Sequence, residues 1–104
     1  MATVIYDFET SGLNVHKDDV IEIGAKCIET RQSYNSLVIP MLLAKTRQGI
    51  PSKITDITGI TNDMLKENGQ KTLPAFLEFF AFLQDIYDQF GEIIMVAHNG
   101  LAFD

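Results

Sequence analysis

Two acidic residues near the start of the chain, Asp7 and Glu9, are the first whose spacing suggests chemistry. They flank Phe8 in the apolar stretch 2–9, whose alternation predicts a β-strand. In a strand, residues i and i+2 share a face and lie about 6.5–7 Å apart along the chain. Two such carboxylates repel each other and are costly to bury, whereas Mg²⁺ or Mn²⁺ prefers oxygen ligands of this kind. A strand end whose acids simply reach water is equally compatible with the spacing.

A second group of polar residues, from His98 to Asp104, follows the apolar run 92–97. That run predicts a strand, and functional sites of α/β sheets collect at the carboxyl ends of their strands. Asp104 would lie in the first turns of a following helix, where the helix dipole favours a carboxylate. Each residue also has a simpler interpretation: His98 as a hydrogen-bonded strand-end histidine, Asn99 as half of an Asn-Gly turn, and Asp104 as a helix-start acid.

The elements that must position these acids are expected in the order β-β-β-α-β. Turn-length connections favour an antiparallel meander for the first three strands, and a right-handed crossover would place the last strand parallel to the first and beside it. The expected strands are 2–9, 19–29, 34–39 and 92–97; the expected helices are 73–90, 51–58 and a short one from Thr61 to Leu65 or Lys66. This arrangement brings Asp104 close to Asp7 and Glu9.

The long helix is expected to begin with Thr72 as its cap and Pro74 in its first turn, and to end at Gly91. Gly59 is expected to end the short helix 51–58, and Thr61 to cap the next one. An apolar stripe at helical spacing predicts the core face of the long helix, which comprises Phe76, Phe80, Leu83, Tyr87 and Phe90 and is widened by Phe79, Phe82 and Ile86. The apolar run 92–97 predicts a strand that is buried on both faces. Cys27 lies in an apolar stretch, and we expect it to be a small core residue.

Length, composition and charge bound the remaining possibilities. The 104 residues are 46% hydrophobic, which predicts one domain, 1–104, with its own core. No apolar run could span a membrane, and the N-terminus has no signal-peptide pattern, so an intracellular protein (cytoplasm or nucleus) is expected. The net charge of −6 and eight Lys and Arg residues argue against tight binding along a long duplex. Carboxylates can still meet phosphate through metal ions.

Together the three acids Asp7, Glu9 and Asp104 point to one chemistry. Carboxylates from two adjacent parallel strands can hold two metal ions about 3.5–4 Å apart, an arrangement that supports in-line displacement at a phosphodiester. The sequence therefore predicts a site for two Mg²⁺ or Mn²⁺ ions.

Three motifs in order carry a resemblance to a known family. The segment Tyr6-Asp7-Phe8-Glu9-Thr10-Ser11-Gly12-Leu13 resembles the first motif, D-x-E-T-x-G, of the DEDD 3′→5′ exonucleases. The segment from Val96 to Asp104 resembles their second motif, N-x₃-[FY]-D, and Ile57 to Leu65 resembles the segment between the two. The chain is most similar in pattern to three-prime repair exonucleases and to proofreading subunits of bacterial replicative polymerases. The His98-Asn99 pair favours the subgroup with a histidine general base, DEDDh.

The resemblance implies an RNase H-like fold, an α/β fold with a mixed sheet, and hydrolysis at a nucleic acid 3′ end that releases nucleoside 5′-monophosphates. The preferred partner would be single-stranded or frayed DNA, with RNA as the alternative. By position in the motifs, Asp7, Glu9 and Asp104 would be the catalytic metal ligands. The residues matching substrate-binding positions are Phe8, Thr10, Leu13, Ile57, His98, Asn99 and Phe103. Core packing is the alternative role for Leu13, Ile57 and Phe103.

The sequence departs from the family pattern at its carboxyl end. The third motif, a general-base His or Tyr followed by a fourth acid, has no match in these 104 residues, and His16 and His98 do not fit its place. We therefore expect residues 1–104 to be the N-terminal part of one exonuclease domain, inactive alone and completed by further chain or a partner. The competing hypotheses are an inactive exonuclease-like module that binds a protein or nucleic acid, and an unrelated α/β domain with chance acids.

Overall fold

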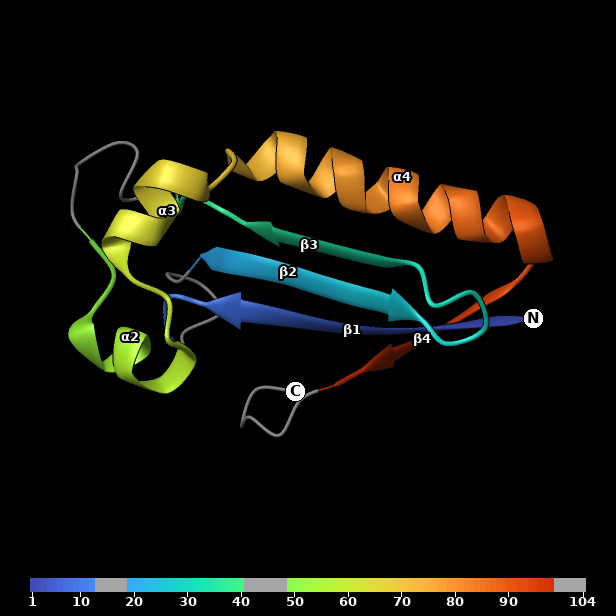
Figure 1. Cartoon of the computed structure of the whole chain (residues 1–104), viewed down its shortest axis with the longest axis horizontal. Helices are drawn as coiled ribbons and strands as arrows, with labels where there is room; N and C mark the ends of the chain where they lie inside the picture. The colour runs from blue at the N-terminus through green and yellow to red at the C-terminus, as the bar shows by residue number, and fades with distance from the viewer. Residues whose placement is uncertain (13–18, 41–48, 99–104) are drawn as a thin grey trace.

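The structure, a computed structural model, describes residues 1–12, 19–40 and 49–98 (Figure 1). It contains four strands and three helices within these ranges, in the expected order β-β-β-α-β with two short helices before the long one. The strands are β1 (Ala2–Thr10), β2 (Val20–Cys27), β3 (Ser33–Leu37) and β4 (Ile93–Ala97), and the helices are α2 (Ser52–Thr58), α3 (Asn62–Asn68) and α4 (Thr72–Phe90).

The four strands form one mixed sheet in the order β3-β2-β1-β4. β1 pairs antiparallel with β2, β2 pairs antiparallel with β3, and β4 lies parallel to β1. The predicted meander and the predicted parallel neighbour are therefore confirmed. In Figure 1, α2 and α3 lie beyond the end of the sheet at which β1 finishes. No helix in the described ranges is long and apolar enough to cross a membrane.

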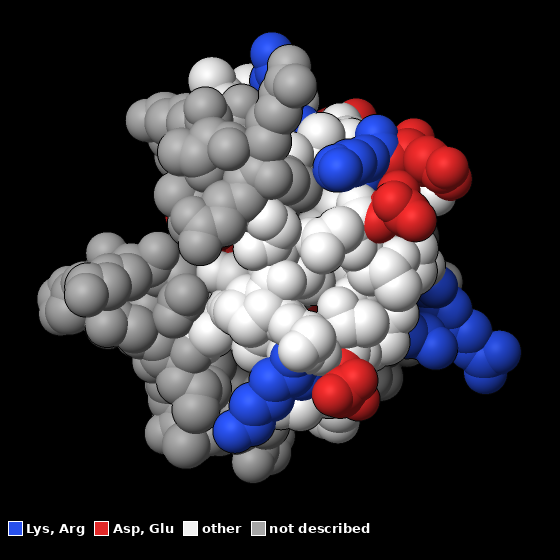
Figure 2. All heavy atoms as spheres, turned by 90° about the vertical axis from the view of Figure 1, so that its left-hand side faces the viewer, with Lys and Arg blue, Asp and Glu red and all other residues white. Residues whose placement is uncertain are grey.

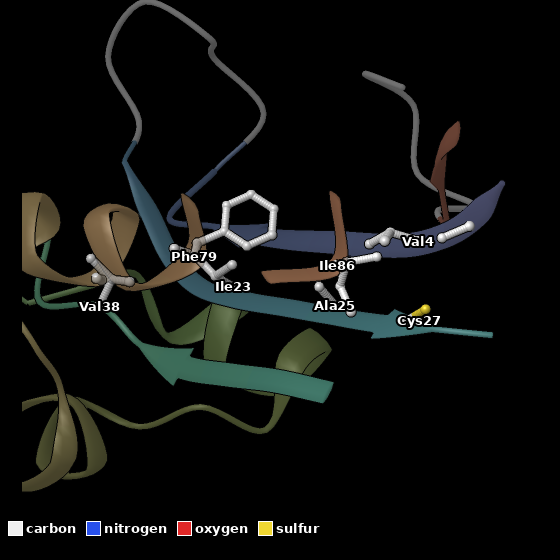
Figure 3. Close-up of a cluster of buried hydrophobic side chains, with 9 residues drawn as sticks. Val4, Ile23, Ala25, Cys27, Val38, Phe79 and Ile86 are labelled. Carbon is white, nitrogen blue, oxygen red and sulfur yellow. The ribbon is translucent and has the colours of Figure 1, made fainter. Parts of the chain in front are cut away.

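The main core lies between α4 and one face of the sheet (Figure 3). Alternate residues of β1 and β2 supply the sheet side of this core, and three residues of α4 supply the helix side. These residues are Ala2, Val4, Ile23, Ala25, Cys27, Ala75, Phe79 and Ile86, with Val38 at one end. Cys27 is fully buried, which confirms its expected place. A second cluster of Ile21, Ile50, Ile60 and Leu65 fixes α3 against the end of the sheet.

Three helix ends follow the cap signals, and one departs from them. Thr61 caps α3, because its hydroxyl accepts a hydrogen bond of 3.1 Å from the backbone N–H of Met64. Gly59 and Gly91 end α2 and α4 in the left-handed conformation that glycine adopts without strain. The predicted cap Thr72 is wrong: Lys71 occupies the cap position, and Thr72 is already the first helical residue.

The expected core stripe of α4 is partly wrong. Ala75, Phe79 and Ile86 face the sheet and are buried, whereas Phe80 is 55% exposed and Tyr87 is 51% exposed. At about 100° per residue, Phe80 and Tyr87 lie roughly a third of a turn away from that buried line. The apolar sector of α4 is thus wider than the strip that the sheet covers.

The expectation that 92–97 is buried on both faces is also wrong. β4 is the edge strand of the described sheet, and Ile94, Met95 and Val96 are each more than 40% exposed. Within the described residues, α4 packs on one face of the sheet only. β4 has only β1 as a neighbour in the described ranges.

Candidate active site

Asp7 and Glu9 point away from the core that α4 covers. In β1, Val4 belongs to the core face, so the odd-numbered positions Asp7 and Glu9 belong to the opposite face. The register pairs Asp7 with Gly24 and Glu9 with Glu22 across the β1–β2 ladder. The predicted shared face of the two acids is therefore observed, and a third carboxylate, that of Glu22, lies beside it.

The electrostatics of Glu9 show that this face concentrates negative charge. Partial burial raises the pKa of Glu9 above its usual value of 4.5, and the carboxylates of Asp7 and Glu22 raise that pKa further. A side-chain hydrogen bond with Asp7 acts in the same direction. Each of these influences disfavours the charged form. A cation between the carboxylates would reverse that balance, so the donor set fits a hard divalent ion.

The described residues do not by themselves complete a metal centre. Within ranges 1–12, 19–40 and 49–98, no three His, Cys, Asp or Glu side chains gather closely enough to hold an ion. Asp104, the third predicted ligand, lies outside the described residues, as do Leu13, Asn99 and Phe103.

A hollow of about 340 Å³ adjoins Asp7 on the same side of the sheet. Its walls include Lys26, Asn35 and His98. The backbone N–H of His98 donates a 2.7 Å hydrogen bond to the carbonyl of Tyr6, which continues the β1–β4 pairing by one residue. This bond anchors His98 beside Asp7, as expected for the residue that follows β4.

The remaining described candidates lie at three different places. The hydroxyl of Thr10 donates to the carbonyl of Gly12, which fixes Thr10 at the turn that follows the acids. Ile57 is 59% exposed on α2, so core packing, the alternative for this residue, is wrong. Phe8 lies on the core face of β1, with its ring centroid 5.8 Å from that of Phe76 and 5.9 Å from that of Phe79. These contacts favour packing over substrate contact for Phe8.

The acidic residue on this face that the sequence analysis missed is Glu22. The alternation of the segment Val20–Cys27 already assigns Glu22 to the polar face of its strand. Its position opposite Glu9 depends on the register of β1 with β2, which shifts between Glu9 and Thr10. A pattern of alternation gives the face of a residue but not its cross-strand partner.

The end of the molecule that carries α2 and α3 faces the viewer in Figure 2. On its coloured surface, Lys and Arg side chains stand apart from one another, with acidic and uncharged side chains between them. This distribution agrees with the low content of basic residues, and the coloured surface that faces the viewer in Figure 2 shows no continuous basic stripe.

Comparisons with known proteins place this geometry in a family. The family model described as Exonuclease matches residues 4–104. A DNA polymerase III of the PolC type from Clostridium perfringens is 39% identical over 108 residues, which is 97% of this chain and 6% of the relative. The DNA polymerase III epsilon subunit of Aquifex aeolicus is 36% identical over 100 residues, or 91% of this chain and 42% of the relative.

A solved structure supports the same fold. The nuclease domain of 3'hExo, a DEDDh family member bound to rAMP, superposes with a TM-score of 0.68 at 17% identity, covering 94% of this chain and 52% of that one. The predicted RNase H-like fold is thus confirmed. The chain spans about half of that solved chain and 6% of the first PolC-type relatives. With a family match over residues 4–104 and the motifs in order, the chain belongs to the DEDD-type exonuclease family.

Proposed function

We propose that the protein containing this chain is a metal-dependent 3′→5′ exonuclease that hydrolyses terminal phosphodiester bonds of DNA and releases nucleoside 5′-monophosphates. The observation that carries this proposal is the shared face of Asp7 and Glu9, where burial and neighbouring carboxylates raise the pKa of Glu9. In a family of exonucleases, two carboxylates that repel each other are what we expect of a metal site before its ions bind.

Asp7, Glu9 and Asp104 would hold the two ions, Mg²⁺ or Mn²⁺. Bound in this way, two divalent ions supply an activated water and stabilise the leaving 3′ oxygen. The chain's own contribution is to hold Asp7 and Glu9 at fixed positions on β1, which pairs with β2 along both acids and with β4 up to Tyr6. A site built on a paired strand keeps its geometry better than one built on a loop.

The terminal nucleotide would meet residues around the carboxyl end of β1. Ile57 offers an exposed apolar side chain on α2, and His98 borders the hollow beside Asp7. Thr10, Leu13, Asn99 and Phe103 are the other residues that we assign to substrate contact by motif, with Phe8 the weakest candidate. The eight Lys and Arg residues and the net charge of −6 suit binding of a short strand end, because few basic side chains are present to contact the phosphates of a long nucleic acid.

We further propose that residues 1–104 form the N-terminal part of one exonuclease domain and are inactive alone. A third motif elsewhere in the protein or a partner chain would supply the general base and the fourth acid. DNA is the preferred substrate because the PolC-type and epsilon relatives are DNA polymerase III proteins. RNA stays the alternative, since another solved structure of similar fold is that of a 3′-exonuclease that recognises the 3′ end of a histone mRNA stem-loop. A polymerase is the expected neighbour.

The test uses the full-length natural protein and two single-stranded DNA oligonucleotides, one labelled at its 5′ end and one at its 3′ end. With Mg²⁺, we expect the 5′-labelled strand to shorten stepwise and the 3′-labelled strand to release labelled mononucleotide at once. EDTA should stop both reactions. Release of mononucleotide from the 5′ end, internal cuts, or unchanged activity in EDTA would contradict the proposal.

The alternative function is an inactive module that binds a protein. Phe80 and Tyr87 on α4 and Met95 on β4 are exposed apolar side chains, and a partner protein that covers them would remove this apolar surface from water. The same assay separates the two functions. A full-length protein that folds, carries no nuclease activity with Mg²⁺ or Mn²⁺, and binds a partner through these residues would establish the alternative.

A further inference from the structure

Glu22 carries a third carboxylate on the face of Asp7 and Glu9, and it has no place in the family motifs that the chain resembles. It lies on β2, directly opposite Glu9 in the antiparallel ladder. Side chains of residues that face each other in this way have Cβ atoms about 4.5–5.5 Å apart. Two like charges at that distance destabilise the sheet, so the pair Glu9–Glu22 is a cost that packing does not explain.

The side chain of Glu22 is held from the side away from Glu9. Asn35, on β3, donates a hydrogen bond of 3.3 Å from Nδ2 to Oε2 of Glu22. Gly24 lies between Asp7 and Asn35 in the sheet, and a Cβ built on it would lie 3.6 Å from Nδ2 of Asn35. That distance is an ordinary van der Waals contact. Gly24 lines the hollow beside Asp7 and adds no side chain to it.

We propose that Glu22 is a positioning residue of the metal site: its anchored carboxylate directs the Glu9 carboxylate towards Asp7 and adds to the negative potential that attracts the divalent ions. This inference rests on the proposed metal-dependent function. The register places Glu22 directly opposite Glu9, and the hydrogen bond from Asn35 holds its carboxylate in place. Glu22 itself needs no contact with the ions, because Coulomb attraction acts over several ångströms.

The test compares Glu22→Gln, Glu22→Asp and a control, Glu67→Gln, in the full-length natural protein. Gln keeps the shape of Glu22 and can still accept from Asn35, so it removes only the charge. Glu67 is an exposed residue of α3, and its substitution changes the net charge by the same amount. Two quantities are measured: the dissociation constant of Mn²⁺, from free ion detected by electron paramagnetic resonance, and the melting temperature without metal.

We expect Glu22→Gln to weaken Mn²⁺ binding about tenfold, the order of effect for one charge several ångströms from a cation. Its metal-free melting temperature should equal or exceed that of the wild type, because a repulsion is removed. Glu22→Asp should restore Mn²⁺ affinity to within about twofold, since the charge stays on the same face. Glu67→Gln should change neither quantity.

Unchanged Mn²⁺ affinity in Glu22→Gln, while Asp7→Asn loses binding, would overturn the role of Glu22 and leave the proposed function standing. A lower metal-free melting temperature in both Glu22 variants, with equal loss of Mn²⁺ affinity, would assign Glu22 to folding and also overturn it. Absence of Mn²⁺ binding by the wild type would overturn both the proposed function and the inference.

Discussion

The two faces of β1 differ in what they bury and in what they cost. On one face, Val4 is fully buried and Phe8 makes ring contacts with Phe76 and Phe79. On the other face, Asp7 and Glu9 lie beside each other, and Glu22 lies opposite Glu9. Burial and the two neighbouring carboxylates all raise the pKa of Glu9. The core-facing residues of β1 thus stabilise the fold, and the acidic residues between them destabilise it. Such a contrast is expected where function, and not packing, selects the residues.

The largest effect should follow from Asp7→Asn on the acidic face. Loss of a residue that only supports a metal ligand lowers activity by up to about a hundredfold. Asp7 is proposed as a direct ligand, so we expect nuclease activity in the full-length protein to fall by more than that. The melting temperature should not fall, since the substitution keeps the shape and removes a repulsive charge. Asp56→Asn, an exposed acid of α2, is the matched control. Equal activity in the two variants would remove Asp7 from the site.

On the apolar face, Phe79→Ala should cost about 3–5 kcal/mol of unfolding free energy, as is typical of buried aromatic residues. Phe79 is 4% exposed, whereas its neighbour Phe80 is 55% exposed. Phe80→Ala should therefore cost less than about 1.5 kcal/mol, with only its ring contacts to Phe76 and Phe79 lost. Urea unfolding of the complete exonuclease domain measures both. Similar losses in the two variants would mean that a further element covers Phe80.

A smaller effect should separate the two threonines that precede or begin helices. Thr61→Ala removes the hydroxyl that accepts from Met64, and it should cost about 1 kcal/mol. Thr72→Ala should be nearly neutral, because Lys71 holds the cap position and makes no side-chain cap bond. The same urea series measures the pair, and a larger loss at Thr72 would restore it as the cap.

The smallest effect is the dependence of stability on pH that Glu9 contributes from the acidic face. The pKa of Glu9 is raised above 4.5 in the folded state. Between pH 4.5 and that raised pKa, the folded state therefore binds more protons than the unfolded state does. Without metal, Glu9→Gln should therefore melt above the wild type at neutral pH. The difference should shrink as the pH falls through the folded pKa and vanish well below pH 4.5, where both states hold the proton. A difference that grows on acidification would contradict the sign.

The sequence predicts the fold better than it predicts exposure. The four strands, the long helix, the parallel pair β1–β4 and the glycine stops at Gly59 and Gly91 all follow from local patterns that the structure confirms. The exposed positions of Phe80 and Met95 do not, because a wide apolar sector does not say which part of it the sheet covers.

The same limit applies to the site. The shared face of Asp7 and Glu9 follows from the period of a strand, which needs no tertiary information. The approach of Glu22 and Asn35 depends on pairings across three strands, and no single stretch of sequence encodes it. Leu13, Asn99, Phe103 and Asp104 stay predictions, since they lie outside the described residues.

The most direct measurement of the central claim is an anomalous diffraction map of the full-length protein crystallised with Mn²⁺, recorded at the manganese absorption edge. The account predicts an anomalous peak within ligand distance of the carboxylate oxygens of Asp7 and Glu9, at about 2.0–2.3 Å. Peaks elsewhere only, with Asp7 and Glu9 paired to Lys or Arg side chains, would contradict it.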